Sequence, residues 1–461
     1  KQSDDKMLPG QVRECYNGFP DATYGLTKRP GFKHIANLET TFDSNKAKWF
    51  YINRDDNEVY VGRIHGGSFG FAQYGTPGIR IWNAVTGIEA TVTYETGTQT
   101  YFQVPRDNLK IITVQDTSIV INTSQVVAAS STTSPSASVT VAASVGALPT
   151  TGTHDEIRKV VNTTGVIDDY FVKFVADNGS SGSGYWEETI GPNISLGVDN
   201  TTMPHELINT GLNTFHFQKI TYTDRLVGDA TSNSDPSFVG EKITNGFFSD
   251  NRLGFLSKDN VSLSQAGDFF NFYFKSAQTT IDSDPVDISC SSIKPTALHS
   301  VLPTAQGVVL FSAKQQFILY SESGVLTPGT ANIRAISNYE MNSTIDPVDV
   351  GTNINFISKT PGYTRVFSMV TRGQEASPQV LDLSRVVKEW VAPGIDQLVA
   401  SPQNSMIALA GQESRELYIY RYYNDGQENL MEAWTSWVLP GEVQFCNIDQ
   451  DDMYMVIEYN P

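Results

Sequence analysis

The stretch from Asp235 to Phe274 constrains the fold of this chain more than any other segment. Within it, the apolar segment Leu253–Leu256 lies between two polar turns, Ser249–Arg252 and Lys258–Asn260. Alternating apolar residues bounded by Asn, Asp and Gly are typical of short antiparallel strands joined by tight turns. The aromatic run Phe269–Phe274 then predicts strands packed in a core, because aromatic rings bury large areas on a pleated surface. The alternative for this run is a platform on which a ligand stacks.

Similar strand pairs are predicted along most of the chain. The segments Trp49–Ile52 and Val59–Val61 flank a polar turn, and Ile79–Trp82 is followed by a turn that ends in Gly87 and a returning strand at Ile88–Thr93. Further pairs are Leu109–Val114 with Ile119–Asn122, Val308–Phe311 with Phe317–Tyr320, Asn355–Ser358 with Thr364–Met369, and Met406–Leu409 with Leu417–Tyr420; Trp434–Leu439 and Met453–Val456 continue the series. This spacing favours a propeller or a sandwich over a parallel sheet. The predicted fold class is therefore mainly β, a β-propeller built from short antiparallel hairpins.

An inserted α+β domain is predicted at residues 128–234, where the composition changes. No Asp, Glu, Lys or Arg occurs in residues 117–154, and Ala128–Ser138 is rich in Ser, Thr, Ala and Pro, as linkers are. The insert is predicted to hold a strand at Val139–Val141 and a short helix at Asp155–Val161. A second strand is predicted at Asp169–Val175, followed by a mobile loop at Gly179–Gly184.

The domain organisation follows from these boundaries. Residues 1–48 are predicted to form an extended N-terminal arm or an irregular cap. Lys28 and Arg29 are expected in a solvated turn there, the alternative being a contact with an acidic partner. Residues 49–127 form the first part of the propeller and residues 235–461 the second. The chain opens without Met and stops at Pro461 directly after a strand-like segment, so we expect it to be a fragment of a longer protein.

The composition argues against several classes of function. The formal net charge is −18, so the surface repels phosphate backbones and disfavours stable nucleic-acid binding, although DNA can still pass without adhering. The three cysteines are widely spaced, which disfavours a disulfide framework or a zinc cluster and indicates a reducing compartment. No apolar run approaches the roughly 20 residues that a membrane helix needs, so membrane insertion is not predicted.

Motifs for catalysis or metal binding are weak. Gly66–Gly70 matches G-x-S-x-G, but the following Gly75, Pro77 and Gly78 disfavour the helix that a nucleophile elbow requires. Asp282–Asp287 resembles a calcium loop but lacks the Gly at its sixth position, so a turn with exposed carboxylates is expected. A turn is likewise expected for the aspartates of 449–452. His205–Glu206 lacks the second His of a zinc protease. No catalytic, cofactor-binding or metal-binding residue is predicted, and the chain is not expected to be an enzyme.

Ordered landmarks along the chain resemble a known family. The segments are Tyr24–Gly31 (YGLTKRPG), Thr202–His205 (TMPH), Pro236–Gly240 (PSFVG), Asn251–Ser257 (NRLGFLS), Phe270–Tyr273 (FNFY) and Asp282–Asp287 (DSDPVD). In this order they are similar to tail tubular protein B, the nozzle protein of short-tailed bacteriophages. The resemblance extends from Tyr24 to about Val456 and weakens between Ala128 and Asn162.

The resemblance implies a structural virion protein located in the tail. Members of that family form a homohexameric ring beneath the tail adaptor (tail tubular protein A), carry the tail fibres at the side and enclose the channel for DNA ejection. The expected partners are therefore further copies of the chain, the adaptor, the fibres and DNA that passes without specific binding. The alternative is a cell-surface or glycan-binding β-propeller with polysaccharide hydrolase activity, for which aromatic residues and carboxylates would share one open cleft.

Overall fold

The computed structural model describes residues 10–39, 47–55, 58–66, 78–161, 169–292, 296–370, 378–387, 389–411, 414–424 and 429–459. Within these ranges the chain forms β-strands and short 3₁₀ segments, and no α-helix is present there. The prediction of a mainly β fold is confirmed. The Gly66–Gly70 motif lies almost wholly outside the described residues.

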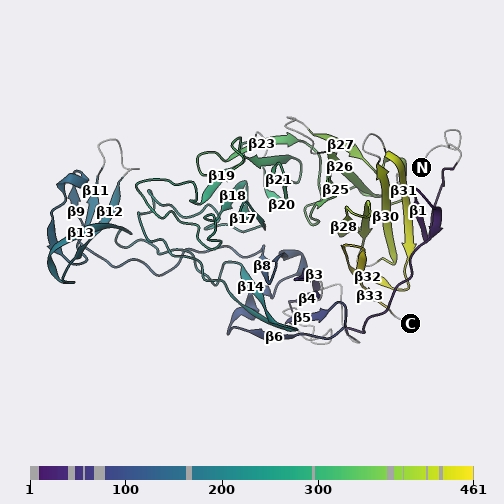
Figure 1. The fold of residues 1–461 in the computed structure, drawn as a ribbon, viewed down its shortest axis with the longest axis horizontal. Coiled ribbons are helices and arrows are strands. Elements are labelled where there is room, and N and C mark those ends of the chain that lie inside the picture. The colour runs from purple at the N-terminus through teal and green to yellow at the C-terminus, as the bar shows by residue number, and fades with distance from the viewer. Residues whose placement is uncertain are drawn as a thin grey trace.

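Seven sheets, which we call blades, form a ring in the part of the chain that is described (Figure 1). The first blade consists of β3 (Ala47–Asn53), β4 (Val59–His65) and β5 (Gly78–Asn83), and the second of β6 (Thr91–Tyr94), β15 (Thr214–Lys219), β14 (His205–Gly211), β8 (Thr117–Asn122) and β7 (Leu109–Val114). The third consists of β16 (Asn245–Ser249), β17 (Arg252–Ser257), β18 (Asn260–Leu263) and β19 (Val286–Ser289), and the fourth of β20 (Leu298–Thr304), β21 (Gly307–Ser312), β22 (Gln316–Tyr320) and β23 (Asn332–Ser337). The fifth consists of β24 (Val348–Asp349), β25 (Asn353–Lys359), β26 (Thr364–Val370) and β27 (Gln379–Asp382), the sixth of β28 (Gln397–Ser401), β29 (Met406–Ala410), β30 (Glu416–Asn424) and β31 (Asn429–Val438), and the seventh of β32 (Glu442–Asp449) and β33 (Asp452–Glu458). Neighbouring strands pair antiparallel, except β6 with β15.

The blades pack face to face, so their central strands are apolar on both faces. In β17, Leu253 and Phe255 face the core shared with β8, whereas Leu256 faces the core shared with β21 and β22. In β25, Phe356 faces the core shared with the β20–β23 blade and Ile357 the core shared with the β28–β31 blade. Because successive residues of a strand point to opposite faces, a continuous apolar run fills two cores at once.

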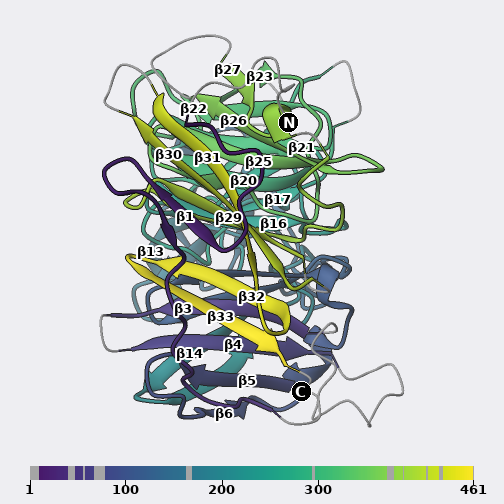
Figure 2. The same ribbon diagram turned by 90° about the vertical axis from the view of Figure 1, so that its right-hand side faces the viewer.

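The last blade closes the ring against the first. Trp49, Val61 and Trp82 of the β3–β5 blade share a core with Phe445 and Tyr454 of the β32–β33 hairpin. The other face of the β3–β5 blade packs on the β6–β15 blade. Figure 2 shows the C-terminal hairpin beside β3. Seven face-to-face cores therefore join seven blades in a cycle, which is the architecture of a β-propeller.

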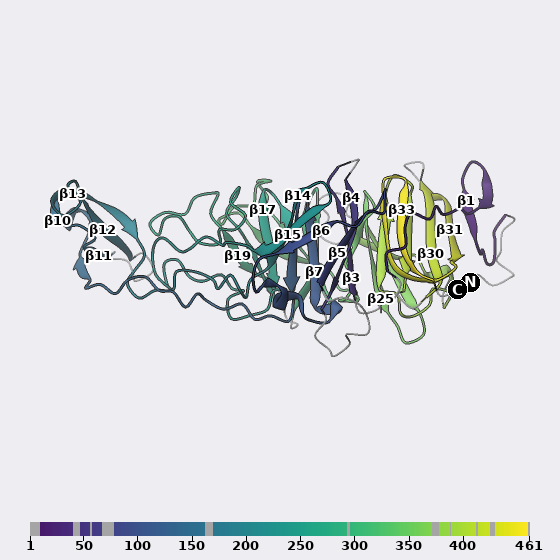
Figure 3. The same ribbon diagram turned by 90° about the horizontal axis from the view of Figure 1, so that it is seen from below.

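A separate five-stranded sheet, which we call the distal sheet, lies at one end of the longest axis of the molecule (Figures 1 and 3). Its strand order is β10 (Thr151–Thr153), β13 (Ser181–Thr189), β12 (Tyr170–Ala176), β11 (Ile157–Val160) and β9 (Thr140–Ala142). The strand predicted at Val139–Val141 is present as β9, and that at Asp169–Val175 as β12. The helix predicted at Asp155–Val161 is wrong, because β11 pairs there with β12 and β9.

The predicted insert is therefore not α+β within its described residues. Two of its strands, β14 and β15, belong to the ring, where β14 pairs with β8 and β15 with β6. Part of the predicted loop at Gly179–Gly184 is also a strand, since β13 begins at Ser181: residues 181–183 pair with β10 and Gly184 pairs with Ala176 of β12. We propose that the insert proper is the distal sheet with its two connecting segments.

Two local predictions in the ring are also corrected. The chain after Gly87 returns along β5 only at Ile88–Ala90, where the amide of Asn83 donates to the carbonyl of Ile88 and the amide of Ala90 to that of Ile81, both at 2.8 Å. The following strand, β6, pairs with β15 instead. The aromatic run Phe269–Phe274 forms turns rather than strands, yet Phe272 and Tyr273 are buried. Phe272 stacks at 5.4 Å on Phe255, so this run belongs to the core as predicted.

The N-terminal arm is more regular than predicted. Its strands β1 (Gly18–Asp21) and β2 (Gly25–Lys28) form a hairpin that lies against β31. The amide of Asn17 donates to the carbonyl of Ser436 at 2.8 Å, and the indole of Trp437 donates to the carbonyl of Gly18 at 2.9 Å. The arm therefore covers the outer edge strand of the β28–β31 blade.

Candidate functional site

The candidate site is a polar cluster where the inner edges of four blades meet. Its members are Lys110 on β7, Asn245 on β16, His299 on β20 and Asp346 just before β24. Lys110 Nζ lies 2.7 Å from Asp346 Oδ2, and Asn245 Nδ2 donates to Asp346 Oδ1 at 3.1 Å and to the carbonyl of His299 at 3.1 Å. The carboxylate of Asp346 thus accepts hydrogen bonds from side chains of two different blades. Asp346 itself lies just before the first strand of a third blade.

The electrostatics of this cluster follow from its enclosure. Burial and, to a smaller extent, the charge of Lys110 lower the pKa of Lys48 on β3 to about 8. Burial and the same lysine lower the pKa of His299 to about 4. The side chain of Asp346 keeps 47% of its surface exposed, yet the surrounding protein removes enough water to favour a raised pKa; the charge of Lys110 and its hydrogen bond outweigh this effect and lower that pKa. The cluster therefore favours an ionised Asp346 and a neutral His299.

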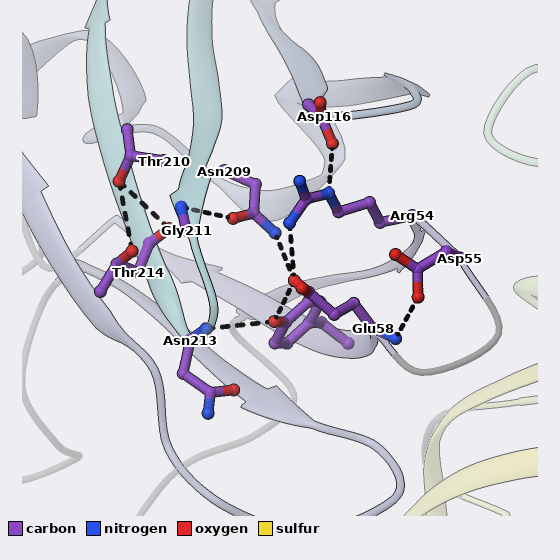
Figure 4. Close-up of polar contacts among 10 residues, drawn as sticks. Arg54, Asp55, Glu58, Asp116, Asn209, Thr210, Gly211, Asn213 and Thr214 are labelled. Carbon is purple, nitrogen blue, oxygen red and sulfur yellow. Dashed lines mark hydrogen bonds and ion pairs between the residues drawn. The ribbon is translucent and has the colours of Figure 1, made fainter.

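A second polar cluster joins the turns of two neighbouring blades (Figure 4). Glu58 Oε2 accepts hydrogen bonds from Arg54 Nη1 at 2.9 Å, from the Tyr60 hydroxyl at 2.9 Å and from Asn209 Nδ2 at 3.4 Å. Arg54 Nε also lies 2.6 Å from Asp116 Oδ1. The first blade is thereby fixed to the turn between β7 and β8 and to strand β14 of the second blade, and the carboxylates of Glu58 and Asp116 are occupied in these contacts.

The motifs singled out from the sequence do not form a reactive centre. In Asp282–Asp287, the carboxylate of Asp284 is buried and accepts the amide of Ile281 at 2.8 Å, so the prediction of exposed carboxylates is wrong for Asp284. Asp282 and Asp287 are exposed as expected. His205 is buried, stacks on Tyr101 at 4.0 Å and contacts the Met203 carbonyl through Nδ1 at 2.8 Å. Burial lowers the pKa of His205 to about 4.

Sequence reasoning missed the fully buried arginines. Arg252 donates to the carbonyls of Ser264, Asp282 and Asp284 at 2.7 to 2.8 Å, and so holds the loop that contains Asp284. Arg225 pairs with Asp235 and lies 4.8 Å from the ring centre of Tyr273. A buried arginine needs such fixed acceptors. The residues next to it in the sequence do not indicate which distant groups will accept its hydrogen bonds.

Within the described ranges, no group of three or more His, Cys, Asp or Glu side chains has the arrangement of a metal site. Nor does any helix in those ranges have the length and apolar character needed to cross a membrane. The three cysteines are buried and unpaired, and burial raises the pKa of Cys290 and of Cys446 to about 12. The polar clusters therefore fix blades to one another instead of assembling a nucleophile with its base.

The class of protein that this ring of seven sheets defines, within the described residues, is the β-propeller. The chain belongs to the bacteriophage nozzle protein family, whose sequence model matches residues 1–145 and 137–461. It is also 27% identical over 326 residues to tail tubular protein gp12 of Escherichia phage T7. That alignment covers 69% of this chain and 40% of the T7 protein. The chain is thus a structural protein of the virion tail.

Solved structures whose backbone follows a similar path share little sequence identity with this chain and superpose on it with low TM-scores. A Bacteroides fragilis protein described provisionally as a 6-phosphogluconolactonase has a TM-score of 0.35 and 7% identity, covering 87% of this chain and 97% of that one. Sqt1 from Chaetomium thermophilum has a TM-score of 0.34 and 10% identity, covering 88% and 92%. At such scores these likenesses carry no conclusion about this chain.

Proposed function

We propose that this chain is a subunit of a six-fold nozzle ring that encloses the path of the ejected genome. In this proposal the ring attaches to the tail adaptor on one side and carries the tail fibres. The observation that carries the proposal is the family match over the whole chain. The role is mechanical, so no catalytic residue is assigned.

The distribution of charge supports a passage to which DNA does not adhere. Several cations are withdrawn into internal contacts: Arg63, Arg225 and Arg252 are almost fully buried, and Lys110 is paired with Asp346. With 50 acidic residues against 32 basic ones, this leaves the surface with an excess of carboxylates. Carboxylates repel phosphates and offer no counterion release, so DNA slides past such a wall.

The closed propeller supports the mechanical part of the proposal. Each blade is bonded to both neighbours by a packed core, so a force on one blade is distributed around the ring. Polar bonds such as that from Lys110 to Asp346 add directional links between blades. A wall of such subunits keeps its shape while a charged polymer passes.

Two measurements test the proposed function. Native mass spectrometry of the purified protein is expected to give a mass of six copies, and a monomer at all concentrations would overturn the ring. Filter binding with duplex DNA at low salt is expected to show no retention, because the net charge is −18. A cryo-EM map of the ring with a strongly basic lumen would overturn the charge mechanism.

A further inference from the structure

The N-terminal hairpin presents an open sheet edge. All four residues of β2, Gly25–Lys28, are exposed, and β2 pairs with β1 on one side only among the described residues. An unpaired edge offers a row of amide and carbonyl groups to a further strand. The hairpin is held firmly in this position, because Trp437 and Thr435 of β31 donate hydrogen bonds to the carbonyl of Gly18 at 2.9 and 3.0 Å.

Large apolar side chains are exposed on this hairpin and elsewhere along the arm. Tyr24 at the hairpin turn keeps 82% of its surface exposed, and Leu26 on β2 keeps 56%. Val12, Tyr16, Phe32 and Ile35 of the same arm are also exposed. So many large apolar side chains on one short arm are typical of a surface that another protein covers.

A second open edge lies on the distal sheet. β9 is an edge strand that pairs only with β11 among the described residues. Val141 in β9 is 61% exposed, and Val139 before it and Val145 after it are exposed as well. The segment carries no charge, so it lacks the charged side chains that usually protect an edge strand from pairing.

The two open edges lie at opposite ends of the longest axis, β1 and its hairpin at one end and the distal sheet at the other (Figure 3). They also differ in charge. Residues 10–35 hold four basic and two acidic residues, whereas residues 139–190, without the undescribed 162–168, hold three basic and six acidic ones. Complementary surfaces at opposite ends of a subunit are what a head-to-tail ring requires.

We infer that β2 of one copy pairs with β9 of the next copy, so that the hairpin and the distal sheet form one sheet across each subunit contact. This inference rests on the proposed ring and names the surface that forms it. Backbone hydrogen bonds along the two edges join the copies, and Tyr24 and Leu26 cover the apolar side chains beside β9. The occupant of the hairpin edge is therefore a second copy of this chain.

Cross-linking tests the contact directly. Two variants of the complete chain, Leu26→Cys and Val141→Cys, are mixed and treated with a short bifunctional thiol reagent. A product of two chains is expected from this mixture, because the two cysteines lie on different copies. The matched control mixes Leu212→Cys with Val141→Cys, since Leu212 is 66% exposed but lies in the turn between β14 and β15. The control mixture is expected to stay uncross-linked.

Assembly is measured in parallel by native mass spectrometry on the unmodified chain, on the double variant Tyr24→Ser/Leu26→Ser and on the control Leu212→Ser. The double variant is expected to lower the assembled fraction at least about tenfold, and the control to leave it unchanged. If the unmodified chain assembles while the double variant also assembles and no cross-link forms, this inference is overturned and the ring stands. If the unmodified chain is monomeric, the ring and the inference both fall.

Discussion

The hydroxyl of Tyr51 donates a hydrogen bond to Asp449 Oδ2 at 2.8 Å, across 398 residues of sequence. Asn53 Nδ2 donates to the same oxygen at 2.6 Å, and the rings of Tyr51 and Tyr454 lie 5.5 Å apart. These contacts link β3 to the β32–β33 hairpin, which forms a different sheet from that of β3. The propeller is therefore closed by side chains rather than by a shared ladder of backbone hydrogen bonds.

Replacing Asp449 tests this closure. The Asp449→Ala variant is expected to lower the free energy of unfolding by about 1–3 kcal/mol, because it leaves two donors on β3 without their acceptor. Urea denaturation followed by tryptophan fluorescence measures the change. The control is Asp451→Ala, which removes an exposed carboxylate that accepts from Asn404 at 3.1 Å and is expected to change stability by less than about 0.5 kcal/mol. Equal losses in the two variants would contradict a special role for Asp449.

Lys48 is expected to make stability rise with pH on the alkaline side. The unfolded chain holds the proton of this lysine up to its ordinary pKa of about 10.4, whereas the folded chain releases it near the lowered pKa of about 8. The unfolded state binds more protons between these values, so the free energy of unfolding increases with pH there. The Lys48→Met variant is expected to be more stable by on the order of 2 kcal/mol at neutral pH, and to lose this alkaline rise.

Urea denaturation at neutral pH and near pH 9.5 measures both effects of Lys48. The matched control is Lys33→Met, which removes an exposed lysine of the N-terminal arm. A variant of Lys48 that keeps the alkaline rise of the unmodified chain would show that another group causes it.

The buried histidines are expected to destabilise the fold in acid. The pKa values of His205 and His299 are lowered to about 4, so the unfolded chain takes up protons at a higher pH than the folded chain does. The contribution of the neutral histidines to the free energy of unfolding is complete above the ordinary pKa of about 6.5, and it decreases as the pH falls from that value towards 4. The His205→Phe variant keeps an aromatic ring against Tyr101 and is expected to remove about 2 kcal/mol of this loss.

The acid effect is measured by urea denaturation at about pH 7.5 and about pH 4.5. The control is His34→Phe, because His34 is exposed. If His205→Phe and the unmodified chain lose equal stability on acidification, the burial of His205 is not the cause.

The native thiols are expected to resist alkylation until the chain unfolds. Burial raises the pKa of Cys290 and Cys446 to about 12, so the reactive thiolate is scarce at neutral pH. Iodoacetamide treatment followed by peptide mass mapping is expected to label neither residue in the folded chain and both in urea. Rapid labelling of Cys446 without denaturant would contradict the closed packing of the β28–β31 blade on β32.

The strands that could be predicted from the sequence are those whose signal is local. Leu253–Leu256 and Val308–Phe311 are apolar runs between turn residues, and the structure has strands at both. The prediction of a helix near Ile157 is wrong because tertiary contacts stabilise a strand there. Arg158 lies 5.4 Å from the ring centre of Trp186, and Lys159 pairs with Asp169 at 2.9 Å. Charged residues on a strand thus gave a misleading local pattern.

Long-range pairings could not be predicted in the same way. The pairing of β14 with β8 joins residues that are 85 to 91 positions apart in the sequence, from His205 with Val120 to Ile208 with Thr117. The polar cluster of Lys110 and Asp346 likewise joins side chains that are 236 residues apart. No local pattern encodes such partners, since only the closed ring brings them together.

The face of the β3–β5 blade that carries Trp49 and Trp82 is covered by strands near the C-terminal end of the described chain. During synthesis, this apolar face remains exposed to solvent while the ribosome makes the intervening blades. The nascent chain therefore carries an uncovered apolar surface until β32 and β33 have been made. Chaperone capture of early intermediates, and aggregation when translation stalls late, follow from this order of completion.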